Sequence, residues 1–179
     1  MERIVVKITA DHLAAAERLV PHNGIARTKV SAVDTLGGIV GELVFAEWLT
    51  GDWRNHEVGS NKGRADLMGL VEVKTSVYPY SERLNLVIRE DYGAKFKPVY
   101  VQLIVDIPDR ANKIITAGLP IIICGFATHA EAVSRPPRAL PMGQGRETPF
   151  KVFATPITRL RPMAEFRGFL NGLMAERGR

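Results

Sequence analysis

Three charged residues with a defined spacing, Asp66, Glu72 and Lys74, form the strongest chemical pattern in the chain. Residues 71–77 alternate apolar and polar side chains, which predicts a β-strand whose side chains point to opposite faces in turn. Glu72 and Lys74 are therefore expected on one face of that strand. Gly69 predicts a turn just before the strand, and such a turn can bring Asp66 back beside Glu72.

Two carboxylates at one point repel each other unless a cation lies between them. Their oxygens are hard ligands that suit Mg²⁺, with Mn²⁺ as a substitute. Lys74, one pleat further along the strand, could orient or deprotonate a water molecule or hold a phosphate. A solvent-exposed strand with a Glu/Lys pair would show the same short pattern, so the surrounding elements decide between the two interpretations.

Asp66, followed after a short turn by Glu72-Val73-Lys74, resembles the signature of the PD-(D/E)XK nuclease superfamily. That superfamily includes restriction endonucleases, Holliday junction resolvases and phage-encoded nucleases. The residue before the Asp is Ala65, where the family pattern has a proline. The resemblance implies an α/β, restriction-endonuclease-like fold, with a mixed central sheet flanked by helices and the site at one edge. It covers residues 31–127, whereas the basic loop and helix of residues 134–179 resemble no element of the family.

A long helix is expected to begin at Ser31 or Asp34 and to end at Gly51. Its apolar residues recur every three or four positions, at Leu36, Ile39, Val40, Leu43, Ala46 and Leu49. Three glycines lie inside it, and each costs about 1 kcal/mol relative to alanine in a helix interior. Gly37, Gly38 and Gly41 therefore predict a close approach of the helix to the sheet or to DNA.

In PD-(D/E)XK enzymes a helix before the core sheet often supplies one more acidic residue to the metal site. Glu42, in the segment Gly41-Glu42-Leu43, resembles that residue. Glu47 is a competing candidate, but five residues further along a helix place it about 140° around the axis. We therefore favour Glu42, with an ordinary solvated helix glutamate as the alternative.

The resemblance implies that Glu42, Asp66 and Glu72 bind one or two Mg²⁺ ions, with the backbone carbonyl of Val73 as a further ligand. Together with Lys74, the three carboxylates make up the predicted catalytic set. Side chains expected to bind DNA lie in the turn before Asp66, at the end of the catalytic strand and in the later basic loop: Ser60, Lys62, Arg64, Thr75, Ser76, Arg135 and Arg138. A plain hairpin loop and a loosely ordered connector are the alternatives for the turn and the loop.

The composition is that of one globular domain spanning residues 1–179. With 179 residues, of which 46% are hydrophobic, the chain can bury a core of its own. A net charge of +5 favours a polyanionic partner. The single cysteine, Cys124, lies in an apolar run and is expected to be a buried packing residue. No 18-residue apolar run and no signal-type start are present, so we expect a cytoplasmic protein without a membrane partner.

The remaining elements follow from local patterns. Residues 53–58 are expected to form the first core strand and residues 99–107 the central strand, with Gln102 as its polar exception. Residues 135–148 are expected to be a long loop, and Thr128 to Glu131 a capping box that starts a short helix. Further strands are expected at residues 2–8, 84–88, 114–116, 119–127 and 150–154, and further helices over residues 9–20 and after Pro162.

These features predict a metal-dependent deoxyribonuclease that hydrolyses DNA phosphodiester bonds, with an endonuclease favoured. A Holliday-junction or branched-DNA resolvase is the alternative enzyme. A non-catalytic DNA-binding or structural subunit with a nuclease-like fold is an alternative of another class, and an accidental motif in a basic α/β domain is a third. The small size favours a homodimer or a larger assembly, because two symmetric sites would be needed to cut both strands. A phage or mobile-element origin is suggested only by the type of family resembled.

Overall fold

The chain folds around a four-stranded mixed β-sheet. The computed structural model describes residues 3–23, 32–60, 63–93, 95–143 and 146–177. The strand order is β1–β5–β4–β2, and β1 and β4 run antiparallel to β5 while β2 runs parallel to β4. The strands are β1 (Ile4–Lys7), β5 (Pro120–Thr128), β4 (Val99–Asp106) and β2 (Val71–Tyr78). The expected mixed sheet and the interior position of residues 99–107 are both confirmed.

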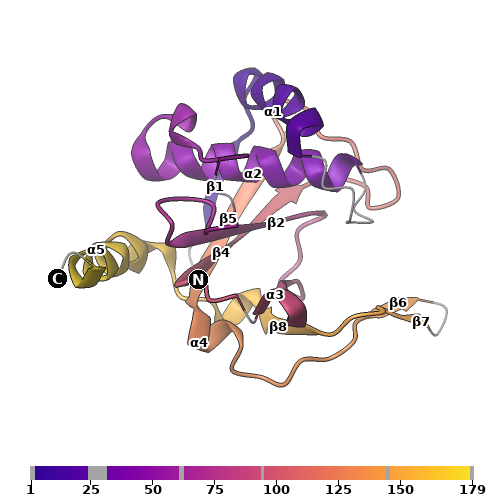
Figure 1. The fold of residues 1–179 in the computed structure, drawn as a ribbon. Coiled ribbons are helices and arrows are strands. Elements are labelled where there is room, and N and C mark those ends of the chain that lie inside the picture. Colours follow the sequence, from indigo (N-terminus) through magenta and orange to yellow (C-terminus); the bar gives the residue numbers. More distant parts are fainter. Residues whose placement is uncertain (1–2, 24–31, 61–62, 94, 144–145, 178–179) are drawn as a thin grey trace.

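Two helices cover one face of this sheet (Figure 1): α1 (Ala10–Asn23) and α2 (Ala32–Thr50). The predicted apolar stripe of α2 is almost entirely buried, because it faces the sheet. Gly51, with φ +85°, ends the helix, and its N–H donates to the Glu47 carbonyl over 2.7 Å. The helix predicted to precede the strand of residues 71–77 is therefore confirmed.

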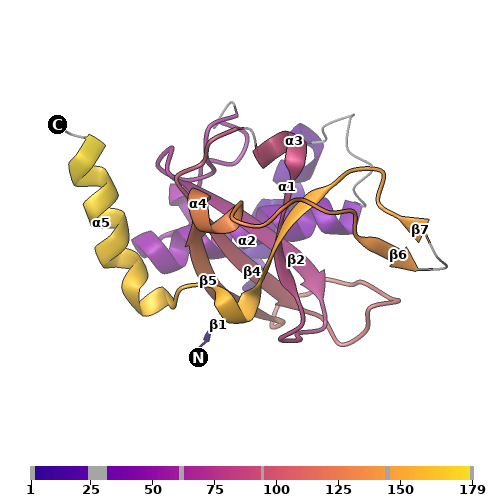
Figure 2. The ribbon, with the colours of Figure 1, turned by 90° about the horizontal axis from the view of Figure 1, so that it is seen from below.

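A smaller layer covers the other face (Figure 2). It consists of β3 (Asn85–Arg89) paired with β8 (Val152–Pro156), and of the short helices α3 (Glu90–Gly93) and α4 (His129–Ala132). Thr128 and Glu131 form the predicted capping box at the start of α4. A second core lies between the two layers, and it buries Leu86, Ile88, Tyr100, Ile104, Ile122 and Cys124. The prediction that Cys124 is a buried packing residue is confirmed.

The C-terminal third adds a short ribbon and a closing helix. The ribbon pairs β6 (Pro141–Gly143) with β7 (Arg146–Glu147) inside the segment expected to be a loop, so that prediction needs correction. Short 3₁₀ turns at Ile157–Arg159 and Met163–Glu165 lead into α5 (Phe166–Arg177). Figure 1 shows the ribbon and α5 at opposite ends of the molecule.

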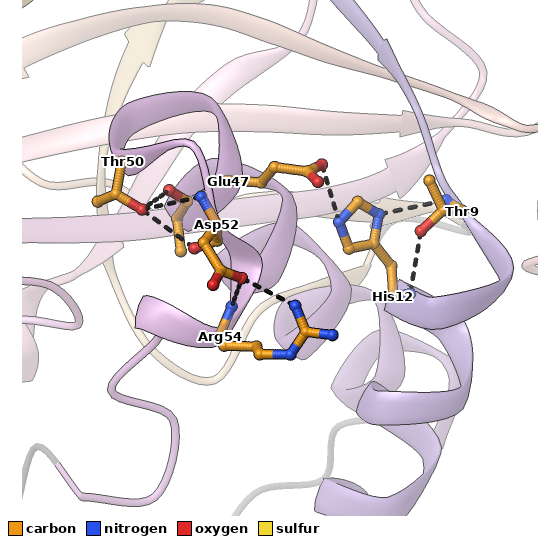
Figure 3. Close-up of polar contacts among 7 residues, drawn as sticks. Thr9, His12, Glu47, Thr50, Asp52 and Arg54 are labelled. Atoms are coloured by element: carbon orange, nitrogen blue, oxygen red, sulfur yellow. Dashed lines mark hydrogen bonds and ion pairs between the residues drawn. The ribbon is translucent and has the colours of Figure 1, made fainter.

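The prediction of a first core strand over residues 53–58 is wrong. A 3₁₀ helix, η1 (Trp53–Asn55), stands there instead. The Asp52 side chain accepts a hydrogen bond from the Arg54 N–H over 2.9 Å, as Figure 3 shows. Such local side-chain bonds satisfy backbone donors that a strand would otherwise pair with a neighbour. Residues 114–116 are not a strand either, and Ile114 is 56% exposed.

Two of the three glycines in α2 allow the helix to approach the sheet. A Cβ at Gly41 would lie 2.9 Å from the Thr75 Cβ and closer still to the Thr75 hydroxyl oxygen, and a Cβ at Gly37 would overlap Val77. At Gly38 a Cβ would meet nothing within 4 Å. The predicted close approach is therefore to the sheet, and it involves Gly37 and Gly41.

This difference predicts opposite effects for the same substitution at neighbouring positions. Gly38→Ala should raise the free energy of unfolding by up to about 1 kcal/mol, because alanine favours the helix. Gly41→Ala should lower it by about 1–3 kcal/mol, because the methyl group forces the helix away from Thr75. Urea unfolding of both variants measures the two values, and equal effects at the two positions would contradict the packing described.

Candidate functional site

A tight hairpin places Asp66 beside β2. Leu67 and Val71 form an antiparallel bridge, and the Leu70 N–H donates to the Leu67 carbonyl over 3.0 Å. Met68 and Gly69 have φ values of +55° and +61°, the backbone of a type I′ turn. The chain therefore reverses directly after Asp66, whose Oδ2 accepts a hydrogen bond from the Val73 N–H over 2.8 Å. The predicted turn is confirmed, and the pairing across it is a single bridge.

The hydrogen bond from Val73 also shows where its carbonyl points. β2 is an edge strand, paired on one side with β4. The N–H and C=O of one strand residue point to the same side, and the Val73 N–H points to Asp66. The Val73 carbonyl therefore lies on the free edge, on the side of the Asp66 carboxylate.

Two lysines contact Glu72. Lys74 Nζ lies 2.6 Å from Glu72 Oε1, and Lys97 Nζ lies 3.5 Å from Glu72 Oε2. Lys97 also donates to the Gly63 carbonyl over 2.7 Å. Sequence reasoning did not include Lys97 in the site, because its position depends on the parallel register that pairs Val71 with Val99. The only signal in the sequence was its place directly before Pro98 at the entry to a buried strand.

Glu42 lies within electrostatic range of the other two carboxylates. Burial raises the pKa of Glu42 well above its ordinary value, and repulsion from Asp66 and Glu72 raises it further, while Lys74 opposes this. Burial, and then repulsion from Glu72, raise the pKa of Asp66 to about 6. The structure thus places Glu42, Asp66, Glu72 and Lys74, which come from α2, the hairpin and β2, within electrostatic range of one another.

Glu47, the competing acidic residue of α2, contacts α1 instead. Its Oε2 lies 3.1 Å from Nε2 of His12, which is fully buried (Figure 3). The His12 Nδ1 accepts a hydrogen bond from the Thr9 N–H, so the neutral ring carries its proton on Nε2, toward Glu47. Burial lowers the pKa of His12, and the Glu47 carboxylate opposes that shift. Glu47 is therefore engaged in the packing of α1 on α2.

The residues expected to bind DNA near the site have different surroundings. The Ser60 hydroxyl is exposed and donates to the Glu57 carbonyl, and Lys62 lies outside the described residues. Arg64 lines a hollow beside the hairpin. The Thr75 hydroxyl is buried beneath Gly41, a position from which it cannot contact DNA. The Ser76 hydroxyl accepts a hydrogen bond from Gln102, over 3.2 Å.

Arg135 and Arg138 belong to another surface. They line a small hollow together with Pro136 and Ala154, a residue of β8. Arg138 also pairs through its backbone with Val152 of β8. Arg135 and Arg138 therefore lie on a surface next to β8, and they do not line the hollow beside the hairpin.

The donor atoms at the hairpin suit a hard divalent cation, although they do not yet surround one. Across the described residues, no three His, Cys, Asp or Glu side chains are arranged to hold a metal ion. The raised pKa values of Glu42 and Asp66 nevertheless indicate repulsion among partly buried carboxylates, which a cation would relieve. Asp66 and the Val73 carbonyl are already on one side of β2, whereas Glu72 faces two lysines and would have to reorient.

No family model, curated protein or solved structure matches this chain. Within the described ranges, no helix has both the length and the apolar character needed to cross a membrane.

The negative charge of Asp66 destabilises the metal-free protein, because burial and repulsion from Glu72 disfavour it. Removing this charge should therefore stabilise the fold. Asp66→Asn should raise Tm by about 2–4 °C at pH 8 in EDTA, since about 1 kcal/mol shifts Tm by that much in a domain of this size. The pKa of Asp66 is raised on folding, so the wild type loses stability as pH rises from about 4 to about 6. The gain in Asp66→Asn should therefore disappear near pH 4.

Thermal unfolding at both pH values, with EDTA or Mn²⁺, measures this effect. Mn²⁺ should raise the Tm of the wild type and leave that of Asp66→Asn nearly unchanged, because only the wild type has the Asp66 carboxylate. If Asp66→Asn were less stable than wild type at pH 8 in EDTA, the ionised Asp66 carboxylate would not be destabilising the metal-free fold, and the prediction would be wrong.

Proposed function

We propose that this protein is a metal-dependent deoxyribonuclease with a restriction-endonuclease-like fold, which hydrolyses phosphodiester bonds within DNA. One observation carries the proposal: Glu42, Asp66 and Glu72 interact electrostatically in a partly buried site with Lys74 at the edge strand of the sheet. Buried carboxylates that repel one another weaken a fold, and they are common where a site serves catalysis.

The residues have distinct roles in this proposal. Glu42, Asp66 and Glu72, with the Val73 carbonyl, would hold Mg²⁺ or Mn²⁺, which neutralises phosphate charge and lowers the pKa of bound water. Lys74 would stabilise the negative charge that develops on the phosphate oxygens. Water adds to phosphorus in line, the bond to the leaving oxygen breaks, and that oxygen takes up a proton.

The surroundings of the site support a DNA substrate. The chain carries a net charge of +5, and Arg64, Lys95 and Lys97 line a hollow beside the carboxylates. Lysine and arginine side chains neutralise DNA phosphates without reading sequence. One catalytic set cuts one strand, so a double-strand break would require two copies of the chain.

Cleavage of supercoiled plasmid and of a four-way junction tests the proposal, with Glu42→Gln compared against Glu47→Gln. Glu42→Gln should reduce Mg²⁺-dependent cleavage by at least about 100-fold, because it removes a charge from the site. Glu47→Gln should stay within about twofold of wild type, because Glu47 faces His12 of α1 and is not part of the carboxylate cluster. Rates are read from gels at matched protein concentration, with EDTA as the metal-free control.

Glu72→Ala and Lys74→Ala should also abolish cleavage. Cleavage that survives both substitutions would assign the activity to another site or to a contaminant. A wild type that neither cuts DNA nor binds Mn²⁺ in the thermal assay would leave the non-catalytic, structural interpretation in its place.

A further inference from the structure

A basic hollow of about 440 Å³ lies directly beside the carboxylate cluster. Arg64, Lys95, Lys97 and Arg177 contribute four cations to its lining, from three separate segments of the chain. Two of them connect it to the catalytic hairpin: Lys97 Nζ lies 3.5 Å from Glu72 Oε2, and Arg177 donates to the Gly69 carbonyl over 3.3 Å. An anion in the hollow would therefore lie next to the proposed scissile position.

An exposed aromatic ring lies at the rim of this hollow. Phe96 lines it and is 68% exposed, the highest exposure among the large hydrophobic residues described. Its ring contacts His129 of α4, with centroids 5.0 Å apart, and His129 Nδ1 lies 3.3 Å from the Tyr100 hydroxyl. The Phe96 ring is therefore backed by His129, and much of its surface is open to solvent.

Met68 adds a second exposed apolar side chain to the same hollow. It is 44% exposed, and its φ of +55° makes it the one non-glycine residue with positive φ in the described part of the chain. Holding an L-residue in this region strains the backbone, a strain that glycine avoids. A large side chain kept at such a position, and left exposed, indicates a use for that side chain.

We infer that this hollow binds an unpaired nucleotide of the DNA strand, with its phosphate among the four cations and its base on Phe96 and Met68. Cations combined with an exposed aromatic ring are the means by which proteins bind single-stranded nucleic acid, because every base has a face that can stack. The volume lies in the range of small-molecule pockets. In a duplex each base is stacked and paired inside the helix, so a paired base cannot lie on Phe96 unless it is flipped out.

The inference extends the proposed nuclease function by naming its substrate class. The expected substrate is DNA in which one strand is unpaired next to the cleaved bond, such as a splayed end, a flap or a branch. The identity of the polymer rests on the proposed function, whereas the preference for an unpaired nucleotide rests on Phe96, Met68 and the size of the hollow.

Binding without cleavage tests the inference. Fluorescence anisotropy in EDTA compares a labelled single strand of about 12 nucleotides with a blunt duplex of the same length. Wild type should bind the single strand at least about tenfold more tightly. Phe96→Ala should weaken single-strand binding by about fivefold or more, with little effect on the duplex, because only an unpaired base stacks. Phe96→Trp should retain the affinity.

Two further variants separate binding from folding. Val5→Ala truncates another exposed apolar residue, on β1 at the far edge of the sheet, and should change neither affinity. Met68→Gly should raise Tm by relieving the backbone and at the same time weaken single-strand binding. A loss of affinity that comes with a loss of Tm would instead be structural, and would overturn the role of Met68.

The outcomes of binding and cleavage are distinguishable. Equal affinity of wild type for both DNAs, or an unchanged single-strand affinity in Phe96→Ala, overturns the inference even if the enzyme cuts DNA. Phe96-dependent binding of the single strand in a protein that never cleaves DNA overturns the proposed function and supports the binding site.

Discussion

The close approach of α2 to β2 is the contact on which the arrangement of the site depends. Gly41 occupies no side-chain space, so the helix backbone lies against Thr75, and Glu42 is carried to the charged residues of the strand. The approach costs about 1 kcal/mol of helix propensity. It also leaves the Thr75 hydroxyl buried without a hydrogen-bond partner among the described residues, which costs about 1–3 kcal/mol. Such local costs are typical of sequence positions that serve a site.

The edge strand β2 supplies three different surfaces. Val71, Val73 and Val77 are buried in the core on the side of α2, whereas Glu72 contacts the lysines on the opposite face. The backbone of Val73 faces the free edge and holds Asp66. Since an edge strand keeps one row of backbone groups unpaired by the sheet, a carboxylate can dock there. A few residues of one strand thus provide core packing, a charged face and a free backbone edge.

The sequence predicted those parts of the site whose structure is determined by residues close together in the chain. Alternation identified β2, and helical spacing identified α2. The same alternation puts Thr75 on the face of Val73 and Val77, so its burial could also have been predicted. The position of Lys97 could not have been predicted, because its place beside Glu72 depends on the register of a parallel strand about 25 residues away. The strand expected at residues 53–58 was wrong because the Asp52 side chain caps a 3₁₀ turn there.

The lysines of the site have two uses in the proposed function. In the structure, Lys74 and Lys97 form ion pairs with Glu72, which offset part of its negative charge. Burial and the remaining repulsion raise the pKa values of the other two carboxylates, Glu42 and Asp66. If Glu72 turned to a cation, Lys74 would lose its present partner and its ammonium group would be available to a phosphate. The ion pair that stabilises the metal-free fold would then place the cation needed for catalysis beside its substrate.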